Sequence, residues 1–165
     1  MRRTVLGSVA FLFVLSIVAA AAGKPNFTGS WTMDRSRSFG LPGDMQQSMT
    51  VAQTDDKIEL ETKLIQPNNE RSVKDTYIID GKEHEFTPTV PPGQPPAKGK
   101  RTSTWLPAGN GIMVTEVTTA ETPKGPATTQ VVRKWTLSAQ GELVIDMYVD
   151  NPNVSYEAKR IFLKK

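Results

Sequence analysis

The ionisable and nucleophilic residues of this chain offer few combinations that could do chemistry. His84 is the only histidine among 165 residues, it lies between Glu83 and Glu85, and the chain has no cysteine. One histidine cannot form a histidine-rich metal site, and thiol catalysis and zinc–thiolate sites both require cysteine. No Gly-x-Ser-x-Gly turn is present, so a serine–histidine–carboxylate triad is not indicated. We interpret His84 as a solvated residue on a surface hairpin, and we expect no bound metal.

The carboxylates are the second group that could act in catalysis. Glu59 and Glu61 would share one face of a strand, with their α-carbons about 7 Å apart. That spacing would suit the two acids of a glycosidase. The same alternation places Ile58 and Leu60 on the buried face and therefore turns the two glutamates toward solvent. No glycine-rich loop precedes a helix, so no nucleotide-binding motif is visible. The sequence therefore predicts a protein that is not an enzyme and has no cofactor.

Residues 1–22 have the pattern of a signal peptide. Arg2 and Arg3 precede an apolar run over residues 9–18, and Ala20–Ala22 supplies small residues for cleavage. The apolar run is too short for a good membrane span, and no later stretch is long enough. We expect an exported protein, periplasmic or extracellular, without an integral membrane segment, that is cleaved near Ala22.

The remaining domain, residues 23–165, is nearly neutral. The whole chain has 20 basic and 17 acidic residues, and the leader holds two of the basic ones, so the formal charge falls from +3 to +1. A near-neutral surface gives no electrostatic reason to bind nucleic acid or a membrane surface. Asn26 and Asn153 begin glycosylation sequons, which matter only in a eukaryotic source.

Alternation of apolar and polar residues predicts about ten strands joined by short turns. Asp80-Gly81 is a typical signal for a two-residue type I′ hairpin. No stretch after the leader has a convincing helical period. The predicted strands cover residues 27–34, 49–53, 57–64, 72–79, 82–87, 101–106, 112–120, 128–137, 142–149 and 154–163.

Successive strands with short connections form an antiparallel meander. Because an open sheet of this size would expose its edges, we predict an all-β, up-and-down barrel of about 8–10 strands. A two-sheet sandwich is the alternative, but no long crossover marks a Greek key. The segment Pro88–Lys100 holds five prolines and cannot be an interior strand. It is either an exposed loop or a lid at the barrel mouth.

Gly29-Ser30-Trp31, in the first predicted strand, resembles the Gly-x-Trp signature of lipocalins and related calycin barrels. In that family the tryptophan plugs the closed end of the barrel, and a basic side chain from the last strand packs across its ring. The resemblance therefore implies a barrel floor made of Gly29, Trp31 and Arg160, with Arg133 as the second choice for the cation. A guanidinium group over an indole ring is a favourable pair.

The segment Trp135–Leu143 resembles a Trp-x-Leu-Ser-x-x-Gly-x-Leu element of small exported bacterial proteins of unassigned function with lipocalin-like barrels. A cavity in such a barrel would have an apolar lining, for which we expect Leu60, Trp105, Leu143, Ile145 and Met147. Two functions stay open. The barrel either binds a small apolar ligand in its interior, or it is a filled scaffold that serves as a non-catalytic structural or interaction module of the cell envelope.

Overall fold

The structure, a computed structural model, describes residues 23–165 apart from 41–42, 68, 91–96 and 124. Ten antiparallel strands form one sheet in the order β4-β3-β2-β1-β10-β9-β8-β7-β6-β5. A short 3-10 helix, η1 (Arg35–Arg37), follows the first strand. The strands are β1 (Gly29–Met33), β2 (Gln46–Gln53), β3 (Lys57–Gln66), β4 (Asn69–Ile78), β5 (Glu83–Phe86), β6 (Ala97–Trp105), β7 (Gly111–Thr122), β8 (Gly125–Leu137), β9 (Leu143–Asp150) and β10 (Ser155–Lys164). The predicted antiparallel meander is confirmed, whereas the predicted leader lies outside the described residues.

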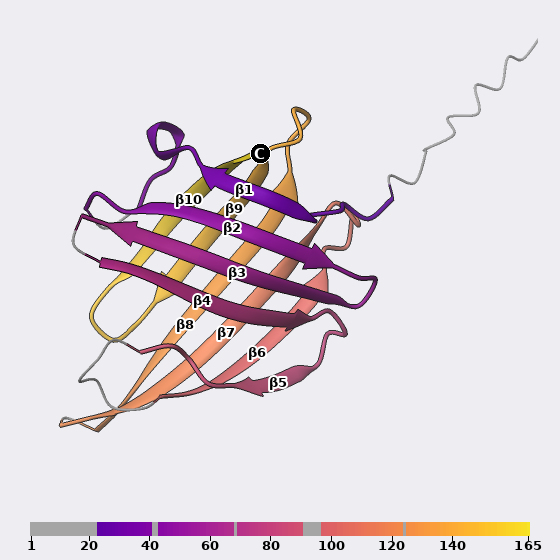
Figure 1. The fold of residues 1–165 in the computed structure, drawn as a ribbon. Helices are drawn as coiled ribbons and strands as arrows, with labels where there is room; N and C mark the ends of the chain where they lie inside the picture. The colour runs from indigo at the N-terminus through magenta and orange to yellow at the C-terminus, as the bar shows by residue number, and fades with distance from the viewer. Residues whose placement is uncertain (1–22, 41–42, 68, 91–96, 124) are drawn as a thin grey trace, which may run out of the picture.

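The sheet curls into a nearly closed barrel because β1 pairs with β10. In this antiparallel pair Trp31 lies opposite Lys164, and Met33 lies opposite Phe162. Figure 1 shows β1–β4 crossing in front of the strands that follow, so the two halves of the sheet enclose an interior. Within the described part of the chain, β4 and β5 have no backbone pairing with each other, which leaves one gap in the wall.

The predicted hairpin at Asp80-Gly81 is wrong, because the strands on its two sides, β4 and β5, do not pair with each other among the described residues. β4 pairs with β3, and β5 pairs with β6. Gly81 has a φ of 72°, but Asp80 does not have a positive φ, so the turn is not type I′. The Asp80 carboxylate accepts the Lys82 N–H at 2.9 Å, and the Gly81 N–H donates to the Ser103 carbonyl on β6 at 3.0 Å. These bonds turn the chain away from β4 and toward β6.

The predicted loop Pro88–Lys100 is also shorter than expected. Its last four residues, Ala97–Lys100, begin β6 and pair with β7. Gly99 permits this strand to lie under a ring, because a Cβ at that position would come within 2.4 Å of the Phe86 side chain. Most of the proline-rich part lies outside the described residues.

The core fills one end of the barrel, which is therefore closed. Inward-facing side chains from opposite strands meet there, and the rings of Phe27 and Tyr77 each contact Trp135 edge-on at 5.8 Å between centroids. Burial of apolar surface is the main stabilising force in such a core. The largest fully buried side chains are Trp31, Trp135, Phe27, Phe162, Ile58, Ile112 and Leu143.

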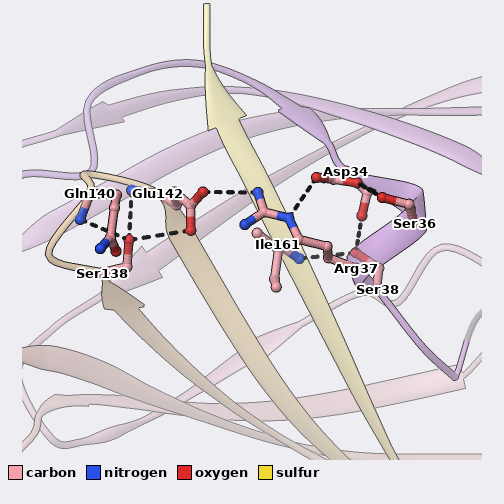
Figure 2. Close-up of polar contacts among 8 residues, drawn as sticks. All are labelled: Asp34, Ser36, Arg37, Ser38, Ser138, Gln140, Glu142 and Ile161. Atoms are coloured by element: carbon pink, nitrogen blue, oxygen red, sulfur yellow. Dashed lines mark hydrogen bonds and ion pairs between the residues drawn. The ribbon is translucent and has the colours of Figure 1, made fainter.

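Polar contacts fix the segment that follows β1 alongside β10 (Figure 2). Arg37 pairs with Asp34 at 2.7 Å and with Glu142, after the β8–β9 turn, at 2.8 Å. The Ile161 N–H donates to the Ser38 hydroxyl at 3.0 Å. Exposed ion pairs add little stability, but these contacts prolong the barrel wall beyond β1 and bring the chain to the rim of the interior space.

Candidate functional site

A cavity of about 350 Å³ occupies the barrel interior away from the closed end. Its volume is near the lower end of the range for small-molecule sites. The rim includes Tyr156, which is 43% exposed, so the cavity reaches solvent. The wall is mixed. The inward faces of β2, β3, β4 and β9 supply the apolar side chains Met49, Leu60, Leu64, Val73, Ile145 and Met147, and polar or charged lining residues include Gln47, Thr62, Arg71, Asp75, Arg133 and Arg160.

Gly40 brings the segment after η1 close against β10 at this rim. Its φ is 70°, a conformation that favours glycine, and a Cβ there would lie 2.6 Å from the Cβ of Ala158. Gly40 also lines the cavity. The polar contacts drawn in Figure 2 fix Asp34–Ser38, the residues that precede Gly40. These contacts lie outside the cavity, and they help to position this part of its wall.

Three of the five residues expected to line a cavity do so: Leu60, Ile145 and Met147. Leu143 is fully buried in the closed end. Trp105 packs against the core cluster, with its ring centroid 4.7 Å from the ammonium group of Lys24. Leu143 shares the inward face of β9 with Ile145 and Met147 but lies nearer the closed end. Alternation therefore predicted the face of each residue, but not its depth along the barrel.

Trp31 lies at the closed end, where the resemblance placed it. It is 1% exposed, and its indole N–H donates to the Phe27 carbonyl at 2.9 Å. The cation beside its ring is Lys164, 5.5 Å from the ring centroid. Gly29 makes room for that lysine, since a Cβ on Gly29 would lie 2.8 Å from Lys164 Cε.

The structure thus gives Lys164 the position expected of Arg160 or Arg133, and both arginines instead line the cavity. Arg160 points inward like Lys164 but precedes it by four residues on β10. In an extended strand that separation corresponds to about 13 Å. The expected barrel floor is therefore corrected to Gly29, Trp31 and Lys164.

Arg160 is a positive charge of the cavity wall that no carboxylate neutralises within the described part of the chain. Its Nε donates to Gln47 Oε1 at 3.1 Å, while its Nη1 is buried and has no hydrogen-bond partner among the described residues. Burial, and then the charge of Arg133, hold the pKa of Arg160 below its ordinary value. The buried indole N–H of Trp135, another lining residue, also lacks a partner there. Buried donors are usually hydrogen-bonded, so this wall offers donors to an acceptor.

Carboxylates neutralise two further interior arginines, Arg101 and Arg133, whereas Arg71, which also lines the cavity, is exposed. Arg101 donates through Nε to Glu116 at 2.6 Å and through Nη2 to Asp75 at 2.7 Å, and Arg133 donates to the second oxygen of Glu116 at 2.5 Å. Burial acts to raise the pKa of Glu116, but the charges of Arg133 and Arg101 outweigh it, and this pKa is lowered. Glu116 is therefore a carboxylate shared between two guanidinium groups.

Arg101 also spans the gap in the barrel wall. From β6 it donates to the Thr76 carbonyl on β4 at 2.9 Å. Its guanidinium carbon lies 4.7 Å from the centroid of the Tyr77 ring and 4.1 Å from that of Phe86, so the cation is held between two rings. The Arg101 side chain thus joins β4 and β6, which are not paired through their backbones in the described part of the chain.

Arg101 and Glu116 were not among the site residues predicted from the sequence. The signal was present in the alternation, since Glu116 follows Ile112 and Val114 on the inward face of β7. A charged residue on a buried face requires a partner of opposite charge. The pattern could therefore have identified a buried charge, although it could not have identified the partner strand.

The residues first considered for catalysis lie outside the cavity. His84 is partly exposed, with Nε2 3.0 Å from Asp80 Oδ1. Glu59 pairs with Lys57 at 2.7 Å on the outer surface, and Glu61 is 42% exposed. Among the described residues no group of three or more His, Cys, Asp or Glu side chains could hold a metal ion. No helix in the described part of the chain has the length and apolar character needed to cross a membrane.

The comparisons with known proteins concern the fold. No protein-family model matches the chain, and neither does any curated protein. Secretory abundant heat soluble protein 4 from Ramazzottius varieornatus has a similar structure, with a TM-score of 0.52 and 14% identity over 87% of this chain and 96% of that one. The barrel is calycin-like. A fatty-acid-binding protein from Manduca sexta gives a TM-score of 0.43 and 17% identity over 85% of this chain and 100% of that one. At 14% identity the likeness to the heat soluble protein shows the fold alone.

Proposed function

We propose that this calycin-like barrel binds one small, mostly apolar molecule in its cavity and holds an acidic group of that molecule at Arg160. The observation that carries the proposal is the buried Nη1 of Arg160, which has no partner among the described residues and belongs to a wall that also presents apolar side chains. A hydrogen bond from a guanidinium group to an anion is stronger than one between neutral groups. The anion would orient the ligand, and its apolar part would pack on the cavity wall.

The apolar side chains of the wall supply the larger share of the binding energy. Each Å² of apolar surface removed from water contributes about 25 cal/mol, and Leu60, Ile145 and Met147 present such surface. A cavity of about 350 Å³ favours this function over the alternative of a filled scaffold. Binding of this kind needs no catalytic group.

Calorimetric titration of the purified barrel with decyl sulfate and with decanol tests this function. We expect decyl sulfate to bind more tightly than decanol. Arg160→Gln should weaken decyl sulfate binding by about 10- to 100-fold, because a hydrogen bond to a charged group contributes about 1.5–3 kcal/mol. Its effect on decanol should stay within a few fold.

Lys159→Gln provides the matched control. Lys159 precedes Arg160 on β10, but it pairs with Asp146 at 3.2 Å and does not line the cavity. Its loss should leave both affinities unchanged. Absence of binding by either compound to the wild-type barrel would contradict the proposed function, and equal affinities in wild type and Arg160→Gln would contradict the role of Arg160.

We also propose that the protein acts outside the cytoplasm. The support is the pattern of residues 1–22, with Arg2 and Arg3 before an apolar run and small residues at Ala20–Ala22. Expression of the full chain in a bacterial host should give an exported product whose N-terminal residue, read by sequencing, is Gly23. Arg2 and Arg3 replaced together by glutamate should cause the protein to accumulate uncleaved in the cytoplasm. A cytoplasmic, uncleaved wild-type product would contradict export.

A further inference from the structure

The buried and partly buried charges of the barrel interior add up to a single positive excess, and Arg71 adds an exposed positive charge to the lining of the cavity. Three buried or partly buried arginines point inward, Arg101, Arg133 and Arg160, and two carboxylates accompany them, Asp75 and Glu116. Asp75 and Glu116 both contact Arg101, and Glu116 also contacts Arg133. The remaining positive charge is the one at Arg160, which hydrogen-bonds to the neutral amide of Gln47.

Glu116 determines how much of this charge the cavity can offer to a ligand. Arg133 lines the cavity together with Arg160, and the charge of Arg133 contributes to the lowered pKa of Arg160. Without a carboxylate beside Arg133, the wall would present two partly buried guanidinium groups to an anion, those of Arg133 and Arg160, in addition to the exposed Arg71. Glu116 lies behind the wall, 9% exposed, and its two oxygens contact Arg101 and Arg133. It can neutralise Arg133 without itself lining the cavity.

We propose that Glu116 sets the charge of the ligand: by holding Arg133, it makes the cavity select molecules with a singly charged acidic group over those with a doubly charged one. This inference rests on the proposed function and adds the class of head group and the residue that selects it. A dianion held at Arg160 would need a second guanidinium group inside the cavity to offset its loss of water. Arg71 also lines the cavity, but it is exposed to solvent, where its charge is screened. Arg133 could serve only by giving up Glu116, which would leave that buried carboxylate with Arg101 alone.

Three probes with the same apolar chain test the inference by calorimetry at about pH 8. Decanol is neutral, decyl sulfate carries one negative charge, and decyl phosphate carries close to two, because the second pKa of a phosphate monoester is about 6. For the wild-type barrel we expect decyl sulfate to bind most tightly. In Glu116→Gln, the ratio of decyl phosphate affinity to decyl sulfate affinity should rise by about tenfold or more, because Arg133 becomes available to the second charge.

Glu121→Gln is the matched control for this change. It lies on the same strand, β7, makes the same chemical substitution and is exposed. It should leave the ratio of the two affinities at the wild-type value. A merely structural role of Glu116 would weaken all three probes together, whereas the proposed role changes their order.

Asp75→Asn offers a second route, because Glu116→Gln could prevent folding. Asp75 is 28% exposed, lines the cavity and contacts Arg101. Its neutralisation adds one positive charge to the interior and should also favour decyl phosphate. An unchanged ratio in every folded variant of this pair would overturn the inference while the proposed function stands. If none of the three probes bound the wild-type barrel, the proposed function itself would fail.

Discussion

Arg101→Met is expected to lower the free energy of unfolding by about 3–5 kcal/mol, the usual cost of removing one partner from a buried ion pair. Methionine keeps apolar contact with the rings of Tyr77 and Phe86, but it cannot neutralise Asp75 or Glu116. The variant also loses the hydrogen bond to the Thr76 carbonyl that joins β6 to β4 across the gap. Urea unfolding followed by circular dichroism measures the change.

Lys100→Met on the same strand is the control for that substitution. Lys100 pairs with Glu83 at 2.8 Å, but both side chains are more than half exposed, 57% and 58%. An exposed pair of this kind contributes about 0–1 kcal/mol. Arg101→Lys should recover only part of the loss, because an ammonium group cannot bind two carboxylates and a carbonyl in the fork geometry of a guanidinium group. Equal stabilities of Arg101→Met and Lys100→Met would show that Arg101 does not hold the gap.

Trp31→Ala is expected to cost about 3–5 kcal/mol, as for other large aromatic residues removed from a core. The ring is 1% exposed, its N–H donates to the Phe27 carbonyl, and Lys164 lies beside its face. Removal leaves a cavity at the closed end and a carbonyl without its donor. The melting temperature of the variant, measured beside the wild type under the same conditions, should be clearly lower.

Tyr148→Ala is a suitable comparison for the tryptophan, because it removes an aromatic ring that is 44% exposed on the outer face of β9. Surface substitutions of this kind usually change stability by about 0.5 kcal/mol or less. A melting temperature of Trp31→Ala equal to that of the wild type would mean that the ring does not close the barrel.

The fold was largely predictable because alternation is a local signal. The residues of β3 show this best, since Ile58 and Leu60 are buried while the intervening Glu59 is exposed. The missing pairing between β4 and β5 was not predictable from Asp80-Gly81. Asp and Gly favour a tight turn in either case, and the bond from Gly81 to Ser103 that decides the outcome joins residues far apart in sequence.

The candidate site was predictable only in part, for a related reason. Leu60, Ile145 and Met147 follow from the inward faces of their strands, but the depth that separates Leu143 from Ile145 depends on how the strands tilt and pair. The role of Arg160 was assigned to the wrong end of the barrel. Lys164 and Arg160 share one face of β10, and only the register with β1 shows which of them reaches Trp31.

The pairing of β1 with β10 has a consequence for the order of folding. The two strands stand near opposite ends of the described chain, and every other strand pairs with a neighbour in sequence. Closing so long a loop has a large entropic cost, so we expect the local hairpins of β1–β4 and β5–β10 to form first and the pairing of β1 with β10 to form last. Until β1 and β10 pair, Trp31 cannot close the end of the barrel. A ribosome-bound chain that lacks β10 should therefore remain an open, ligand-free sheet.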